Sequence, residues 1–224
     1  MPSRPPARPA MSGREVLSLT LDRVGDLPEP CATCIFWELD PVLAARAMRE
    51  GDPELDKEAW LSAALLEWGS VGRIAYVDDQ PAGYLTYAPP RLVPRAAAFP
   101  TAPVGADAIL LMTARVLPEF QGQGLGRMLV QGAAKDVMRR GIRAMEAFGQ
   151  RRVAAEEGAQ MRSCIVPADY LSAVGFKTVR DHKQFPRMRL DLRTALSWRE
   201  DMEQVVERLI AQVRAPVLTT GQRA

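Results

Sequence analysis

The sequence predicts an α/β protein of the α+β type, in which helices flank a mixed, mostly antiparallel sheet. Two observations support this fold class. Candidate strands and helices both occur along the chain, but they do not alternate one for one, as they would in a doubly wound parallel fold. Two stretches, 73–88 and 176–192, have the pattern of β-hairpins, and hairpins pair their strands antiparallel.

The N-terminal half is expected to form a strand, two helices and a hairpin. The strand alternates apolar and polar residues, and the first helix begins with the N-cap Asp40 and the first-turn proline Pro41. Trp60, Ala64 and Trp68 form an apolar stripe on the second helix. The expected bounds are 16–21 for the strand, 40–49 and 56–68 for the helices, and 73–77 and 82–88 for the hairpin strands.

The C-terminal half begins with a strand at 108–116 that leads through a glycine-rich turn into a helix at 125–140, which Gly141 ends as a C′ glycine. The inward residues of this helix are Leu125, Leu129, Ala133 and Val137. The remaining elements are a strand at 142–148, a short helix at 167–174, hairpin strands at 176–180 and 187–192, and a late helix at 198–213. The apolar stripe of the late helix must be buried, either on its own domain or in a homodimer contact.

The composition is that of a soluble globular protein. The chain has 224 residues, of which 47% are apolar and 25% are charged, enough for one sizeable core. The net charge is +2, and the lysines and arginines are spread along the chain, so charge does not indicate a nucleic-acid partner. The apolar stretches are far shorter than a membrane-spanning helix, so we expect no membrane partner.

The first residues are rich in proline and arginine and lack the apolar core of a signal peptide. We therefore expect a disordered leader at 1–13, a single domain at 14–193, and a C-terminal helix and tail at 194–224. Without a secretion signal, we expect a cytoplasmic protein whose three cysteines are reduced thiols.

The most informative segment is the glycine-rich turn Gln121–Gly126, between a predicted strand and a predicted helix. Such a turn presents backbone N–H groups at the positive end of a helix dipole, and this arrangement binds phosphate. The dinucleotide-binding pattern G-x-G-x-x-G fails in both possible registers, because its third glycine is replaced by Arg127 in one and by Leu129 in the other. Glu146 does match the acidic residue that this pattern expects about twenty residues further on. The P-loop pattern fails because no Gly-Lys-Ser/Thr follows the turn.

The turn instead matches Q/R-x-x-G-x-G/A, with Gln121, Gly124 and Gly126 at the defined positions. At this point the chain resembles the GCN5-related N-acetyltransferase (GNAT) superfamily. The resemblance covers 16–192 in element order, and it is sharpest around the turn and at Gly175-Phe176, which follows a short helix and precedes a hairpin. It implies acetyl-CoA as co-substrate and a parallel strand pair that splays apart at the CoA site.

The resemblance also implies which residues hold the co-substrate. The pantetheine arm would pair with the backbone of Ala114 and Val116, between the strand at 108–116 and its parallel neighbour at 142–148. The pyrophosphate would lie on backbone N–H groups of Gln121, Gly122, Gln123, Gly124, Gly126 and Arg127. A primary amine would attack the thioester directly, and the alternative function is a non-catalytic acyl-CoA-binding or regulatory module.

The candidate proton-transfer groups depart from the family pattern. Many members carry a tyrosine four residues before the glycine of the Gly-Phe pair, where this chain has Leu171. Tyr170 stands one residue earlier, rotated about 100° around a helix, so it is either the general acid or a packing residue. Glu146 is the candidate general base or a salt-bridged structural residue, and His182 and a water relay are the alternatives. Cys164 would border the thioester, either as a thiol that assists acyl transfer or as an inert buried thiol.

Cys31 and Cys34 form a C-x-x-C pair that leaves three roles open: half of a zinc site, a redox pair, or a structural role near the acceptor. We expect no metal, because no second C-x-x-C is present. Trp37 and Glu38 follow where the resemblance places the loop over the acceptor, so all four residues are candidates for acceptor binding. Trp37 and Glu38 would otherwise be a buried aromatic residue and a helix-start acid. The segment is similar to one in bacterial members of the family whose substrates are unassigned.

Overall fold

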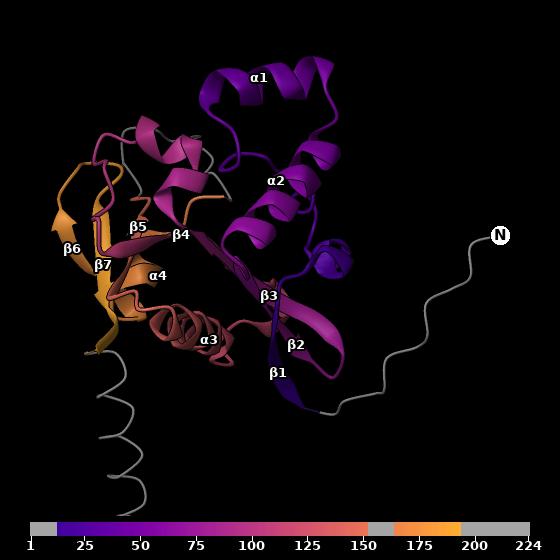
Figure 1. Cartoon of the computed structure of the whole chain (residues 1–224). Coiled ribbons are helices and arrows are strands. Elements are labelled where there is room, and N and C mark those ends of the chain that lie inside the picture. Colours follow the sequence, from indigo (N-terminus) through magenta and orange to yellow (C-terminus); the bar gives the residue numbers. More distant parts are fainter. Residues whose placement is uncertain (1–12, 152–163, 194–224) are drawn as a thin grey trace, which may run out of the picture.

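A seven-stranded sheet forms the centre of the protein, with strand order β1-β2-β3-β4-β5-β7-β6 (Figure 1). The structure, a computed structural model, describes residues 13–151 and 164–193. The strands are β1 (Arg14–Ser18), β2 (Gly72–Val77), β3 (Gln80–Ala88), β4 (Ala108–Val116), β5 (Ala144–Phe148), β6 (Lys177–Arg180) and β7 (Arg187–Asp191). The α-helices are α1 (Pro41–Glu50), α2 (Pro53–Glu67), α3 (Leu125–Arg139) and α4 (Ala168–Ala173).

Neighbouring strands pair antiparallel except for β4 and β5. This parallel pair extends only from Ala108 opposite Ala144 to Leu110 opposite Glu146. Beyond Leu110, β4 stays paired with β3 as far as Val116 but leaves β5. The predicted mixed, mostly antiparallel sheet with a splayed parallel pair is therefore confirmed.

A β-bulge in β4 lies where the two strands separate. Thr113 pairs with Thr86 whereas Leu111 pairs with Tyr87, so Met112 is the extra residue. A bulge bends and twists its strand, which carries the end of β4 away from β5. Since side chains alternate between the two faces of a strand, the extra residue also leaves Thr113 on the same face as Met112.

Beyond the bulge, the two faces of β4 pack against different hydrophobic clusters. On the α3 face, Ala114 and Val116 pack with the hydrophobic cluster that includes residues of α3 and α4. On the other face, which we call the cysteine face, Thr113 contacts Trp37, whose cluster includes Cys31 and residues of α2. Figure 1 shows α1 and α2 on one side of the sheet and α3 on the other.

Two predicted strands in the N-terminal half need corrected bounds. β1 spans Arg14–Ser18 rather than 16–21, because the chain leaves the sheet and enters a 3-10 helix at Leu21–Asp26. The hairpin turn is also tighter than predicted. Asp78 and Asp79 have φ values of +47° and +64°, as the two central residues of a type I′ turn require, so β3 begins directly after them.

Both N-terminal helices begin with an Asp-Pro sequence. The start of α1 at Asp40 is confirmed, but α2 begins at Pro53 rather than at 56. Asp52 Oδ1 accepts hydrogen bonds from the backbone N–H groups of Glu54 and Leu55, at 3.1 and 3.2 Å, so it caps the helix earlier than the apolar pattern indicates. The buried residues of α2 are Lys57, Leu61 and Ala64.

The helix α3 follows the prediction closely. Its four predicted inward residues are all buried, and Gly141 has a φ of +78°, as a C′ glycine does. The Ile142 backbone N–H donates to the Val137 carbonyl at 3.2 Å. Ile142 therefore belongs to the end of the helix, and β5 begins at Ala144 rather than at 142.

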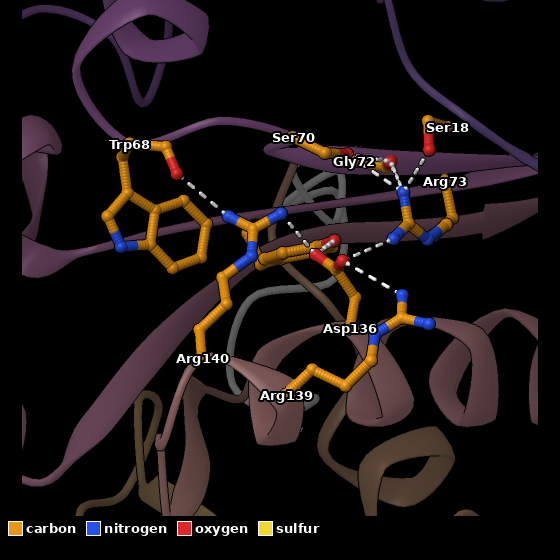
Figure 2. Close-up of polar contacts among 9 residues, drawn as sticks. Ser18, Trp68, Ser70, Gly72, Arg73, Asp136, Arg139 and Arg140 are labelled. Atoms are coloured by element: carbon orange, nitrogen blue, oxygen red, sulfur yellow. Dashed lines mark hydrogen bonds and ion pairs between the residues drawn. The ribbon is translucent and has the colours of Figure 1, made fainter.

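A buried carboxylate fixes α3 to the sheet (Figure 2). Asp136 is 7% exposed. It accepts hydrogen bonds from Tyr87 Oη (2.7 Å), Arg140 Nη2 (2.6 Å) and, as an ion pair, Arg73 Nη2 (2.9 Å). Arg140 in turn stacks over the Trp68 ring, 4.2 Å from its centroid. Burial raises the pKa of Asp136, but the hydrogen bond from Tyr87 and the charges of Arg73 and Arg140 outweigh burial and lower the pKa below its ordinary value.

Several predictions lie outside the described residues. These are the leader, apart from Gly13, and the late helix at 198–213 with its proposed homodimer contact. Within the described ranges, none of the helices has the length and apolar character needed to cross a membrane.

Candidate active site

The glycine-rich turn connects the end of β4 to the first turn of α3. Gly122 and Gly124 have φ values of +75° and +80°, a left-handed conformation that favours glycine. Gly124 is the N-cap of α3, and since it has no side chain it cannot accept from the first N–H groups of the helix. Those groups, from Leu125 onward, lack an intrahelical partner. The first turn of α3, which lies inside the described range, carries no acidic side chain.

A cleft of about 560 Å³ opens beside this turn. Its lining combines the end of β4, the turn, the start of α3 and the segment that leads into α4. The lining residues are Ala114, Arg115, Val116, Phe120, Gln121, Gly122, Gly124, Leu125, Gly126, Ile165, Pro167 and Tyr170. The cleft is thus formed where β4 has left β5, and it is suited to an elongated ligand with an anionic end.

The structure brings six of the eight predicted CoA-binding residues to the cleft, and Gln123 and Arg127 are outside its lining. Gln123 instead accepts two hydrogen bonds from Arg14, at its carbonyl (2.9 Å) and at Oε1 (3.2 Å). The sequence did not indicate Arg115, Phe120, Ile165 and Pro167 as lining residues, because no motif marks them, and it indicated Leu125 only as a core residue.

Tyr170 lies in the cleft, although its sequence position is one residue from that of the family tyrosine. Its hydroxyl donates to the Gly126 carbonyl at 3.1 Å, and burial raises its pKa to about 12. A Cβ added at Gly126 would lie 2.7 Å from this hydroxyl oxygen, so the glycine makes room for the tyrosine. Leu171, at the family position, is fully buried in the core.

Glu146 and His182 lie away from the cleft. The Glu146 carboxylate is 3% exposed, and it accepts from the Gly105 backbone N–H and from Arg189 Nη1, each at 3.0 Å. These partners make it a structural residue that joins β5 to β7, so the geometry gives no support to the predicted general base. His182 Nδ1 accepts from the Phe185 backbone N–H at 2.9 Å, in the turn between β6 and β7.

A second, small cavity lies on the cysteine face, with a volume of about 10 Å³. We call it the thiol cavity. It is lined by Cys31, Cys34, Trp37, Glu38, Lys57, Tyr84, Thr86, Thr113 and Cys164. All four predicted acceptor residues therefore come together with Cys164. The cavity shares its walls with the cleft, since Thr113 adjoins Ala114 along β4 and Cys164 adjoins Ile165.

Trp37 and Glu38 are held by buried contacts. Trp37 Nε1 donates to the Cys164 carbonyl (2.8 Å) and to Thr113 Oγ1 (3.1 Å). The Glu38 carboxylate forms a buried ion pair with Lys57 and accepts from the Trp37 backbone N–H at 3.0 Å. Trp37 is thus a buried aromatic residue, and Glu38 is a paired carboxylate rather than a helix-start acid.

The three cysteines, all within the described residues, form no disulfide, and the closest pair is not the C-x-x-C pair. Cys34 Sγ lies 3.0 Å from Cys164 Sγ, and Cys31 Sγ instead accepts a long contact of 3.7 Å from Arg115 Nη1. The hydrogen bond from Cys164 lowers the pKa of Cys34 to about 7, against the opposing effect of burial. Among the described residues, no cluster of three or more histidine, cysteine or acidic side chains could hold a metal ion.

Comparison with known proteins agrees with this geometry. The model of the acetyltransferase (GNAT) family matches residues 29–157. The chain is similar in structure to the PaiA N-acetyltransferase from Thermoplasma acidophilum, solved in complex with coenzyme A. The sequence identity is 14%, the match covers 80% of this chain and 99% of the other, and the TM-score is 0.52.

Two further solved structures are similar to a lesser degree. An N-acetyltransferase from Staphylococcus aureus Mu50 has 13% identity, 81% and 99% coverage of the two chains, and a TM-score of 0.47. The GNAT family N-acetyltransferase YhbS from Escherichia coli, in complex with CoA, has 15% identity, 83% and 85% coverage, and a TM-score of 0.45. No curated protein matches the chain.

Proposed function

The chain belongs to the acetyltransferase (GNAT) family, and on this premise we propose that it moves an acetyl group from acetyl-CoA to a primary amine by direct attack. The co-substrate of this family is acetyl-CoA. One observation carries the proposal for this chain. A glycine-rich turn that leads into the start of α3, where no side chain caps the helix, lines a cleft between two diverging strands, which fits a phosphate group followed by a long, narrow arm.

We assign the pyrophosphate to the backbone N–H groups of Gln121–Gly126 and Arg127. The positive φ of Gly122 and Gly124 supports this assignment, since left-handed residues are typical of turns whose N–H groups bind anions. The pantetheine arm is assigned to the backbone of Ala114 and Val116, on the α3 face of β4. The 14–193 region acts in this proposal as one acetyltransferase domain.

Tyr170 is proposed to assist the leaving thiolate. Its pKa of about 12 keeps the hydroxyl protonated at neutral pH. A thiol has an ordinary pKa of about 8.5, so complete proton transfer from Tyr170 to the thiolate would be uphill. The hydroxyl, turned from the Gly126 carbonyl to the sulfur, therefore acts as a hydrogen-bond donor to the developing charge, and not as a full proton donor.

The amine is proposed to approach from the cysteine face, because the α3 face is taken up by the donor site. Among the described residues that line the cleft, the titratable side chains are Arg115 and Tyr170, with neither a carboxylate nor a histidine. We propose that water takes the proton from the amine, so that the enzyme contributes chiefly by alignment of the two reactants.

The test is acetyl transfer from acetyl-CoA to a panel of amines, followed by mass spectrometry of each amine. The panel includes an aminoglycoside, a polyamine, a peptide N-terminus and a lysine-containing peptide. The proposal expects an acetylated product from at least one class, with rates that saturate in acetyl-CoA. If acetyl-CoA binds in calorimetry but no amine is acetylated, the alternative of a non-catalytic acyl-CoA-binding module is favoured.

A further inference from the structure

The closest contact between sulfur atoms in the thiol cavity joins two cysteines that are far apart in the sequence. Cys34 Sγ and Cys164 Sγ are 3.0 Å apart and 130 positions apart along the chain. A disulfide bond has a length of about 2.05 Å, so a shift of about 1 Å would bring the sulfur atoms to bonding distance. Cys31, the sequence partner of Cys34, points to Arg115 instead.

Side chains of neighbouring residues hold the backbone of both cysteines in place by hydrogen bonds to their carbonyl groups. Lys57 Nζ donates to the Cys34 carbonyl at 3.1 Å. The Cys164 carbonyl accepts from Trp37 Nε1 at 2.8 Å and from Thr113 Oγ1 at 3.0 Å. The pair is half-buried rather than sealed, which leaves it within reach of a small reagent.

The electrostatics of the pair favour reaction. The pKa of Cys34 is lowered to about 7, chiefly by the hydrogen bond from Cys164, so the Cys34 thiolate is more populated at neutral pH than that of an ordinary cysteine. A thiolate is the reactive form of cysteine, and a second thiol in contact with it is the arrangement of a redox-responsive pair.

The position of Cys164 links this pair to the donor cleft. The next residue, Ile165, lines the cleft, as do Pro167 and Tyr170 of the same segment. A covalent bond at Cys164 would therefore fasten the wall of the donor cleft to the loop that carries Cys34 on the cysteine face.

We propose that Cys34 and Cys164 form a hydroperoxide-sensitive dithiol, and that their disulfide slows acyl transfer by locking the cysteine face to the donor cleft. The second half of this proposal rests on the proposed function, whereas formation of the disulfide does not.

The oxidation proceeds in two steps that balance. The Cys34 thiolate attacks one oxygen of the hydroperoxide, an S–O bond forms, the O–O bond breaks, and the leaving oxygen takes up a proton. The Cys164 thiol then attacks the resulting sulfenic sulfur, an S–S bond forms, and hydroxide leaves with the Cys164 proton as water. The peroxide gains the two electrons that the two sulfur atoms lose, and a dithiol reductant reverses the change.

The experiment treats the reduced full-length protein with hydrogen peroxide, blocks the remaining thiols, and maps disulfides by mass spectrometry after trypsin cleavage. Trypsin leaves Cys31 and Cys34 together on the peptide 24–46 and Cys164 on the peptide 163–177. The matched control Cys31→Ser is therefore essential, because a crosslink that persists in this variant must involve Cys34. We expect the crosslink in wild type and in Cys31→Ser, and its loss in Cys34→Ser and Cys164→Ser.

Acetyl transfer is measured on the same samples. We expect oxidation to lower turnover at least fivefold in wild type and in Cys31→Ser, with full recovery after dithiothreitol. Failure to find the 34–164 crosslink overturns the dithiol, and a crosslink without a change in turnover overturns its regulatory role. Absence of acetyl transfer in the reduced protein contradicts the proposed function instead, and the crosslink still tests the dithiol.

Discussion

The two faces at the end of β4 differ in whether backbone groups or side chains form the site on them. On the α3 face, the proposed donor site consists of backbone N–H groups in a turn of six consecutive residues, Gln121–Gly126. On the cysteine face, the thiol cavity consists of side chains from segments as distant as Cys31 and Cys164. A backbone site requires glycines at fixed spacing and so leaves a local signature, whereas a side-chain site is assembled by the fold and leaves almost none.

The largest expected effect is on the free energy of unfolding, when the buried carboxylate that fixes α3 to the sheet is removed. Replacing Asp136 with Asn leaves Arg73 and Arg140 without their buried counter-charge, which should lower the free energy of unfolding by about 3 kcal/mol or more. Urea denaturation checks this prediction. The control is Asp107→Asn, which breaks a partly exposed pair with Arg189 and should cost less than about 1 kcal/mol. Equal losses in both variants would contradict the anchoring role of Asp136.

The same variant tests a pH dependence. Because the folded pKa of Asp136 is lowered, its stabilisation is present above the unfolded pKa of about 3.9 and is lost as pH falls through the folded pKa. Wild type should therefore lose stability below about pH 4 more steeply than Asp136→Asn does. Urea midpoints measured between neutral and acidic pH compare the two slopes.

The next effect is on acetyl-CoA affinity, through a substitution in the glycine-rich turn. Gly124→Asp places a carboxylate where we assign the pyrophosphate, and at about 4 Å the repulsion is worth up to about 4 kcal/mol. We expect acetyl-CoA affinity in calorimetry to fall at least ~100-fold. Any side chain is strained at this φ of +80°, but aspartate and asparagine tolerate the left-handed conformation better than most residues, so both should lower the unfolding temperature by the same small amount. The neutral control Gly124→Asn has nearly the same shape, and an equal loss of affinity in that variant would argue against an electrostatic cause.

A smaller effect is expected at Tyr170. The variant Tyr170→Phe keeps the ring beside Gly126 but removes the hydroxyl, and one lost hydrogen bond to a developing charge corresponds to about tenfold in kcat. The affinity for CoA should stay within about twofold of wild type. Unchanged kcat would assign Tyr170 to packing, which is the other role that its sequence position suggests.

The smallest effect tests whether the two faces are independent. Trp37→Phe removes the indole N–H that bonds the Cys164 carbonyl and Thr113. Thr113 Oγ1 still donates to that carbonyl at 3.0 Å, so the expected loss of stability is about 1 kcal/mol. Acetyl-CoA affinity should not change. A tenfold loss of affinity would show that the cysteine face controls the donor site, and hence that the two faces are not independent.

The sequence was sufficient to predict the strand and the helix on either side of the glycine-rich turn. The glycine spacing excluded a dinucleotide and identified the turn, and the strand and helix around it agree with the structure because their apolar periods are strong. The sequence left open whether Glu146 is a general base or a salt-bridged structural residue, since its partners Gly105 and Arg189 come from distant segments that no local pattern reveals. Similarly, nothing in the sequence pairs Cys34 with Cys164 rather than with Cys31, because only the folded sheet brings them together.

The most direct test of the central claim is the structure of the protein with CoA bound. The account predicts the pyrophosphate on the N–H groups of Gln121–Gly126, the pantetheine arm along Ala114 and Val116, and the sulfur within about 4 Å of the Tyr170 hydroxyl. A pyrophosphate bound away from the turn, or a pantetheine arm that follows the cysteine face of β4, would contradict it.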